Sequence, residues 1–98
     1  MPKLNVLIAG STGYIGVQLI KLLIKHQNVN IKYLCGNNSV GKDISYYDKS
    51  LRFKRLPKIV KFEKKYLTKI DVIFTALPNG EAQEISKYLT SNNTLIDL

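Results

Sequence analysis

The 98-residue sequence contains no tryptophan and only one cysteine, one histidine and one methionine. The lone thiol, Cys35, cannot form a disulfide within the chain and is typical of a protein from a reducing compartment, so we expect a cytoplasmic location. His26 is the single histidine, and no His, Cys and carboxylate side chains occur at metal-ligand spacing. We therefore predict no metal site.

Long apolar runs are also absent. The apolar-rich stretch 15–24 is interrupted by Gln18 and Lys21, whereas a membrane-spanning helix needs about 20 apolar residues. We therefore predict no membrane segment. The apolar share of 45% is nevertheless sufficient for the core of one small domain, which we place at residues 1–98.

Arginine occurs only twice, so lysine supplies nearly all of the positive charge behind the formal net charge of +8. Much of this charge falls between Lys49 and Lys69. Such a segment is either a patch for phosphate backbones or a solvated surface, and a charge run by itself favours the solvated surface. We predict no nucleic-acid partner.

Four segments have the pattern of strands. Short apolar runs at 4–9 and 71–76 predict buried strands of a parallel sheet, and residues 94–98 predict a last one. Residues 29–35 alternate apolar and polar and predict a further strand.

Two helices are predicted between these strands. The first begins near Ile15 and ends near His26, with an apolar stripe of Ile15, Leu19, Ile20, Leu22, Leu23 and Ile24. The second spans residues 80–89, with Asn79 as its N-cap. The segment 51–69 is ambiguous, because Pro57 breaks any long helix while Phe53, Leu56, Ile59, Val60, Phe62 and Leu67 require partial burial.

Three glycines at three-residue spacing, Gly10, Gly13 and Gly16, lie directly between the first predicted strand and the first predicted helix. Glycine lets a pyrophosphate approach backbone N–H groups, and the helix N-terminus supplies unpaired donors and a positive dipole end. Ser11 and Thr12 would add hydroxyl donors. The loop therefore predicts a dinucleotide site, with a tight turn that binds nothing as the alternative.

The end of the second predicted strand indicates which dinucleotide is bound. An NAD site places Asp or Glu about 20 residues past the loop, on the ribose 2′-hydroxyl. Here residues 35–42 contain no acid. NADP is therefore favoured over NAD, with Asn37, Asn38, Ser39 and Lys42 as candidate contacts, and a plain polar turn is the alternative.

The element order β-α-β-β-α-β, with an irregular segment in its middle, predicts a partial Rossmann-like α/β fold with a parallel sheet and right-handed crossovers. The last strand has no closing helix, although a parallel sheet needs both faces covered. We therefore expect residues 1–98 to be a dinucleotide-binding domain that is either truncated, as a fragment of a longer protein, or in need of a partner.

Two further sites have competing interpretations. Cys35 could be a nucleophile, but its position at a strand end favours a structural thiol. Tyr46 and Tyr47 could stack on bases, although we expect them to pack under the irregular region.

Four segments together resemble the N-terminal region of N-acetyl-gamma-glutamyl-phosphate reductases: 10–16, 34–42, 72–80 and 95–98. The resemblance covers essentially the whole chain, and the sequence Ala-Leu-Pro-Asn-Gly at 76–80 is its most specific part. The family often has Ser-Arg at or near Asn37 and Asn38, and it usually has His at the position of Asn79.

The resemblance implies which residues contact the cofactor. In this family Ser11, Thr12, Gly13, Tyr14 and Ile15 would hold the pyrophosphate. Ser39 would lie near the 2′-phosphate, and Leu77 and Pro78 would approach the nicotinamide half.

The resemblance also implies NADPH-dependent reduction of an acyl phosphate to a semialdehyde in arginine biosynthesis. The family uses a cysteine thiolate that forms a thioester and a histidine acid/base, and both belong to a C-terminal substrate domain that the resemblance implies is missing from residues 1–98. Neither Cys35 nor His26 matches them, so we predict no catalytic residue in this chain, which should be inactive alone. For the full-length protein we expect a small-molecule acyl phosphate substrate and a homo-oligomer.

Three other assignments remain open. An aspartate-semialdehyde dehydrogenase would share the chemistry. An extended short-chain dehydrogenase would share the loop, although its Tyr-x-x-x-Lys pair is absent from residues 1–98. A stand-alone nucleotide-binding module belongs to a different functional class.

Overall fold

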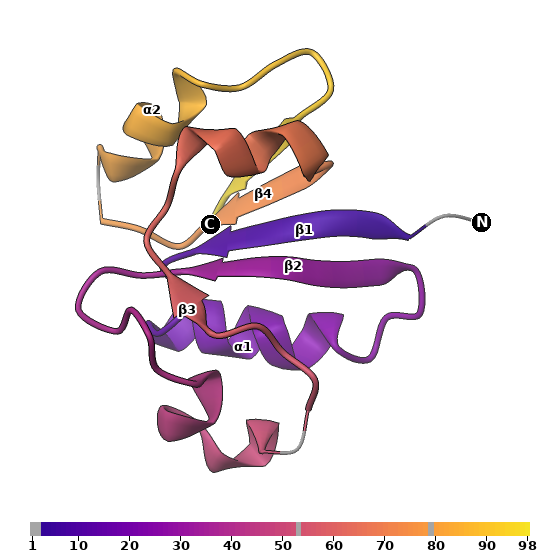
Figure 1. Cartoon of the computed structure of the whole chain (residues 1–98), viewed down its shortest axis with the longest axis vertical. Helices are drawn as coiled ribbons and strands as arrows, with labels where there is room; N and C mark the ends of the chain where they lie inside the picture. The colour runs from indigo at the N-terminus through magenta and orange to yellow at the C-terminus, as the bar shows by residue number, and fades with distance from the viewer. Residues whose placement is uncertain (1–2, 53, 79) are drawn as a thin grey trace.

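The computed structural model describes residues 3–52, 54–78 and 80–98. Five parallel strands form one sheet in the order β3-β2-β1-β4-β5. The strands are β1 (Leu4–Ala9), β2 (Val29–Cys35), β3 (Ile59–Val60), β4 (Val72–Thr75) and β5 (Thr94–Asp97). The arrowheads of β1, β2 and β4 point the same way in Figure 1. The predicted Rossmann-like fold class is therefore confirmed.

Strand β1 is the centre of the sheet because it pairs with β2 on one side and β4 on the other. Its residues 6–9 are buried, as expected for a strand covered on both faces. Val6 and Ile8 pack into one hydrophobic cluster, whereas Leu7 and Ala9 pack into the other. The apolar run at 4–9 thus supplies both cores at once.

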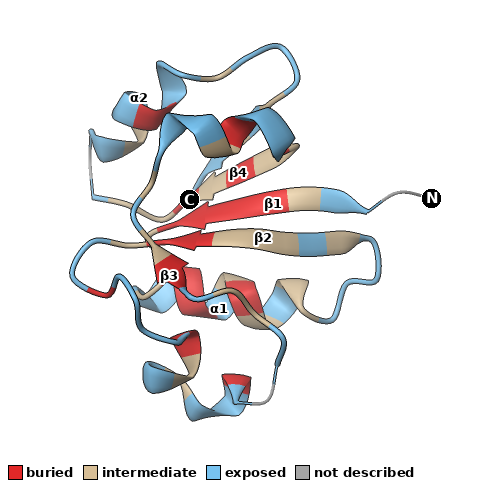
Figure 2. Ribbon diagram, in the orientation of Figure 1, coloured by how far each residue is buried: buried red, intermediate tan, exposed pale blue. Residues whose placement is uncertain are grey.

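Different elements cover the two faces. One face carries α1 (Tyr14–Leu23) and two short 3-10 helices, η1 (Ile44–Tyr46) and η2 (Lys49–Leu51). The other face carries the 3-10 helix η3 (Lys64–Lys69) and α2 (Glu81–Ser86). Figure 2 shows the buried residues on the sheet and on the sides of these elements that face it. Within the described ranges, none of the helices combines the length and apolarity needed to cross a membrane.

Helix α1 faces the sheet through different residues than its apolar stripe predicts. Gly16, Val17 and Ile20 are buried, whereas Ile15 and Leu22 are 52% and 68% exposed. The prediction was wrong for Ile15 and Leu22 because Gly16 brings the first turn of the helix close to the loop before it. That contact turns residues 16, 17 and 20 toward the sheet.

The ambiguous segment 51–69 contains an additional strand and a 3-10 helix. Strand β3 has only two residues, Ile59 and Val60, which pair with Leu34 and Cys35 of β2. A strand this short has no periodicity to read, so the predicted order lacked it. The expected burial of Leu56, Ile59, Val60, Phe62 and Leu67 is confirmed, and Phe53 lies outside the described residues.

Helix α2 is shorter than predicted, because it spans Glu81–Ser86 instead of residues 80–89. Gly80 precedes it with a φ of 89°, a left-handed conformation that favours glycine. The predicted N-cap, Asn79, lies outside the described residues. Ile85 is the buried anchor of this helix.

A side-chain amide closes the turn that enters β4. Asn93 Nδ2 donates to the carbonyl oxygens of Leu67 (3.0 Å) and Ile70 (2.6 Å), so it satisfies the last carbonyls of η3. Its Oδ1 accepts the backbone N–H of Thr90 at 3.0 Å. Asn93, directly before β5, thus joins the loop between α2 and β5 to the turn between η3 and β4.

We expect Asn93→Ala to lower the free energy of unfolding by about 1–3 kcal/mol, because it leaves the carbonyl oxygen of Ile70 without its partly buried hydrogen bond. Urea unfolding of the 98-residue chain measures the change. Asn92→Ala, at an exposed neighbouring position, is the matched control, and equal stability of the two variants would contradict the assigned role.

Candidate functional site

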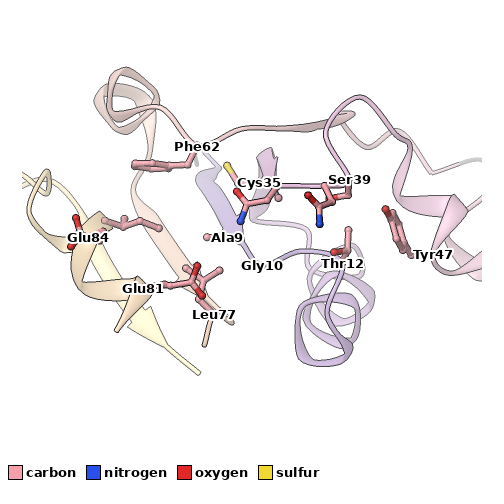
Figure 3. Close-up of a pocket in the computed structure, with 14 residues that line it drawn as sticks. Ala9, Gly10, Thr12, Cys35, Ser39, Tyr47, Phe62, Leu77, Glu81 and Glu84 are labelled. Atoms are coloured by element: carbon pink, nitrogen blue, oxygen red, sulfur yellow. The ribbon is translucent and has the colours of Figure 1, made fainter. Parts of the chain in front are cut away.

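A cavity of about 540 Å³ lies at the carboxyl ends of β1, β2 and β4. The sheet order reverses at β1, because the chain continues from β1 outward to β2 and β3 and then returns to β4 and β5. Parallel sheets bind ligands at such a switch point. The volume is in the range of about 300–1,000 Å³ that is usual for small-molecule sites. Figure 3 shows the side chains that line this cavity.

Two of the three loop glycines are required by the packing of the chain. Gly10 has a φ of 80°, and a β-carbon there would lie 2.4 Å from the carbonyl oxygen of Ala76. A β-carbon on Gly16 would lie 2.2 Å from the carbonyl oxygen of Gly10. No side chain fits at either position, because backbone occupies the space.

Gly13 differs from the other two glycines. Its φ of −74° suits any residue, and a β-carbon would lie 3.6 Å from the Gly10 carbonyl oxygen, an ordinary contact. The fold therefore does not require glycine at the N-cap of α1. The space beside it is available to something outside the chain.

The N-terminus of α1 leaves backbone donors free. Within the described residues, the N–H groups of Tyr14, Ile15 and Gly16 have no backbone acceptor outside the helix, and no side chain caps it. The first turn also contains no acidic residue. Unpaired N–H groups and the positive end of the helix dipole favour an anion here.

The Ser11 side chain makes a hydrogen bond within the chain. Its side chain is buried, and its hydroxyl donates to the carbonyl oxygen of Cys35 at 3.0 Å. The N–H groups of Gly10 and Ser11 approach the same oxygen at 3.2 Å. The Ser11 hydroxyl is therefore used to join the loop to β2, while Thr12 lines the cavity.

The residues after β2 form one end of the cavity. Asn37, Asn38 and Ser39 all line it, as does Gly36. Gly36 lies against Ser39, since a β-carbon on Gly36 would lie 2.3 Å from Ser39 Oγ. This contact buries Ser39, whereas Asn37 and Asn38 are exposed.

The residues after β4 form the opposite end. Leu77 lines the cavity, and Glu81, Glu84 and Ile85 of α2 line it as well. Pro78 is exposed, and its carbonyl oxygen accepts the N–H of Glu81 at 3.2 Å. In Figure 3 the two carboxylates lie across the cavity from Thr12, Ser39 and Tyr47.

Six of the twelve predicted contact residues line the cavity: Gly10, Thr12, Asn37, Asn38, Ser39 and Leu77. Of the others, Gly16 and Ser11 support the loop, Gly13, Tyr14 and Ile15 begin the helix, and Pro78 lies outside. The assignment of all twelve to a ligand remains a prediction.

Several lining residues were not predicted. Phe62 follows β3, so recognising that strand would have indicated it. Tyr47 was expected under the irregular region, but it lines the cavity, and its neighbour Tyr46 is 71% exposed. The expected packing of these tyrosines was wrong because Ile44 and Leu51 fill the space against α1.

Cys35 lines the cavity but is buried, and burial raises the pKa of its thiol to about 12. The thiol is therefore protonated at neutral pH and is a poor nucleophile. His26 is exposed beyond the far end of α1, where its Nδ1 accepts the N–H of Asn28. Among the described residues, no three His, Cys, Asp or Glu side chains are placed to hold a metal ion.

Comparisons with known proteins agree with this geometry. The sequence profile of the semialdehyde dehydrogenase NAD-binding domain matches residues 5–98. The chain is 41% identical over 98 residues to an N-acetyl-gamma-glutamyl-phosphate reductase of Ehrlichia ruminantium, covering 98% of this chain and 28% of that protein. It is 44% identical over 82 residues to the enzyme of the same name from Thermoanaerobacter pseudethanolicus, covering 82% of this chain and 24% of that protein.

A solved structure shares the fold. Aspartate semialdehyde dehydrogenase with NADP from Candida albicans superposes with a TM-score of 0.75 at 22% identity, covering 97% of this chain and 29% of that chain. The present chain thus spans less than a third of the length of the relatives it matches.

Alanine substitutions should distinguish the glycines that the fold requires, Gly10 and Gly16, from Gly13. We expect Gly10→Ala and Gly16→Ala each to destabilise the 98-residue chain by about 3 kcal/mol, because the new methyl group collides with backbone. Gly13→Ala should change stability by less than about 1 kcal/mol. Urea unfolding midpoints provide the measurement, and a large loss of stability in Gly13→Ala would show that the fold itself needs this glycine.

Proposed function

The chain belongs to the semialdehyde dehydrogenase family as its NAD-binding domain, and on that basis we propose that it is the NADP-binding part of an N-acetyl-gamma-glutamyl-phosphate reductase. The observation that carries the dinucleotide site is the uncapped start of α1 at Gly13, directly after the cavity-lining residues Gly10 and Thr12 at the switch point. The choice of reductase is supported by relatives of that name at 31–44% identity.

The residues at the site fit a dinucleotide pyrophosphate. The unpaired N–H groups of Tyr14 and Ile15, with the Thr12 hydroxyl, would hold its oxygens. The missing side chain at Gly13 would let the pyrophosphate lie against the backbone. Gly10, Ser11 and Gly16 would act by placing this loop.

The two ends of the cavity suggest how the dinucleotide lies. Asn37, Asn38 and Ser39 would contact the adenosine ribose, and none of them is a carboxylate that would repel a 2′-phosphate. Leu77 and Pro78 would approach the nicotinamide. Glu81 and Glu84 lie at that end, where the ring of the oxidised cofactor carries positive charge and not phosphate.

The bound cofactor would supply a hydride for the reduction of an acyl phosphate to a semialdehyde. This chain would bind and orient the cofactor, while the groups that attack the substrate would come from a further domain. Cys35 is buried and protonated, and His26 lies beyond the far end of α1, so neither is placed to act on a substrate. We further propose that the full-length enzyme is cytoplasmic and homo-oligomeric.

Titration of NADPH into the 98-residue chain tests cofactor binding. We expect saturable binding, weakened about tenfold or more in Gly13→Ala, because the methyl group occupies the pyrophosphate position. Ser91→Ala, in the exposed loop after α2, is the control and should bind like the unchanged chain. Absence of binding, or equal binding by Gly13→Ala, would argue against this site.

The second test concerns catalysis. We expect the reading frame beyond Leu98 to encode a domain with a new cysteine and a later histidine. The full-length protein should reduce N-acetyl-gamma-glutamyl phosphate with NADPH in preference to aspartyl phosphate. Phosphate-dependent reduction of NADP with the semialdehyde by the 98-residue chain alone would refute the assignment of catalysis to a further domain.

A further inference from the structure

We propose that Lys42 binds the 2′-phosphate of the dinucleotide and thereby selects NADP over NAD. This inference rests on the proposed function. The residues that line the cavity include no lysine or arginine, although a phosphate dianion is bound most strongly by charge-assisted hydrogen bonds. A cation that binds the 2′-phosphate in this site would therefore have to reach in from outside the lining.

Two tyrosine rings place the Lys42 ammonium beside this lining. Its Nζ lies 4.6 Å from the ring centroid of Tyr46 and 6.0 Å from that of Tyr47. Tyr47 itself lines the cavity, on the side of Ser39 and Thr12 (Figure 3). Contact with a ring face attracts the cation and leaves N–H donors of the ammonium free for a phosphate.

The backbone of Lys42 is held on both sides. Its N–H donates to the carbonyl oxygen of Ser39 at 3.0 Å, and its own carbonyl oxygen accepts the N–H of Ile59 at 3.0 Å. The preceding Gly41, with a φ of 87°, donates to the carbonyl oxygen of Ile59 at 2.8 Å. Lys42 is thus tied to β3 and to the buried, cavity-lining Ser39.

The nearby acids are already engaged. Residues 36–62 contain two, Asp43 and Asp48. Asp43 accepts the N–H of Ser45 at 3.0 Å, and this bond lowers the pKa of its carboxyl group, with a smaller contribution from the charge of Lys58. Asp48 pairs with Lys21 of α1 at 2.6 Å. Within the described residues, Lys42 takes part in no ion pair.

The Asp48–Lys21 pair also fixes the tyrosines. It joins the residue directly after Tyr47 to α1, while Asp43 caps η1 on the other side. The segment that carries both rings is therefore anchored at each end. The carboxylates that line the cavity, Glu81 and Glu84, belong to α2 at the opposite end, where Glu84 pairs with Lys87 at 3.1 Å. A 2′-phosphate would meet attraction at the Lys42 end and repulsion at the other.

The test compares NADPH and NADH binding to the 98-residue chain and to Lys42→Met, which keeps the apolar stem and removes the charge. We expect the variant to bind NADPH about tenfold or more weakly and NADH within about twofold of the unchanged chain. Lys42→Arg should restore the preference. The affinity for adenosine 2′,5′-bisphosphate should fall in Lys42→Met as the affinity for NADPH does. The affinity for adenosine 5′-monophosphate should stay unchanged, like that for NADH.

Lys25→Met is the matched control, because it removes the same charge from an exposed lysine after the far end of α1. It should leave both affinities unchanged, and thermal unfolding should show that all variants are folded. If Lys42→Met weakened NADPH and NADH binding equally, or changed neither affinity, the role of Lys42 would be overturned while the proposed function would stand. Failure of the unchanged chain to bind either nucleotide would overturn the proposed function and this inference with it.

Discussion

The structure depends on one contact between backbone segments, where the first turn of α1 lies on the loop that follows β1. The carbonyl oxygen of Gly10 occupies the space of a β-carbon at residue 16, and the carbonyl oxygen of Ala76 occupies that of a β-carbon at residue 10. Strand β1, strand β4 and helix α1 therefore meet without side chains between them. This contact brings the free N–H groups of α1 to the edge of the sheet, where the cavity lies.

A second constraint fixes the other side of the loop. The carbonyl oxygen of Cys35 accepts the N–H groups of Gly10 and Ser11 and the hydroxyl of Ser11. The end of β2 and the start of the loop therefore hold each other in place. Cys35 is itself buried in a hydrophobic cluster, and this burial raises the pKa of its thiol, so the same residue supports the site without being reactive.

Charge is distributed unequally along the cavity. The loop after β2 and Thr12, just before α1, present neutral polar groups, and Lys42 lies beside the ring of the cavity-lining Tyr47, whereas α2 presents Glu81 and Glu84. This distribution favours one orientation of an elongated ligand that carries phosphates on one half, with the phosphates away from Glu81 and Glu84. The orientation proposed for the cofactor follows from this asymmetry and does not require a contact with every lining residue.

The sequence by itself determined the bounds of β1 and β2, the parallel α/β fold and the glycine loop, because these depend on local apolar runs and on backbone positions that only glycine can occupy. It could not locate β3, the buried face of α1 or the Ser11 hydroxyl bond, since each depends on a partner distant in the chain. Only the tertiary structure placed Tyr47 in the cavity, and only there is Lys42, a candidate contact from the sequence, seen beside the rings of Tyr46 and Tyr47. Their placement depends on the Asp48–Lys21 ion pair and on hydrogen bonds to Ile59, and these join segments that no local pattern connects.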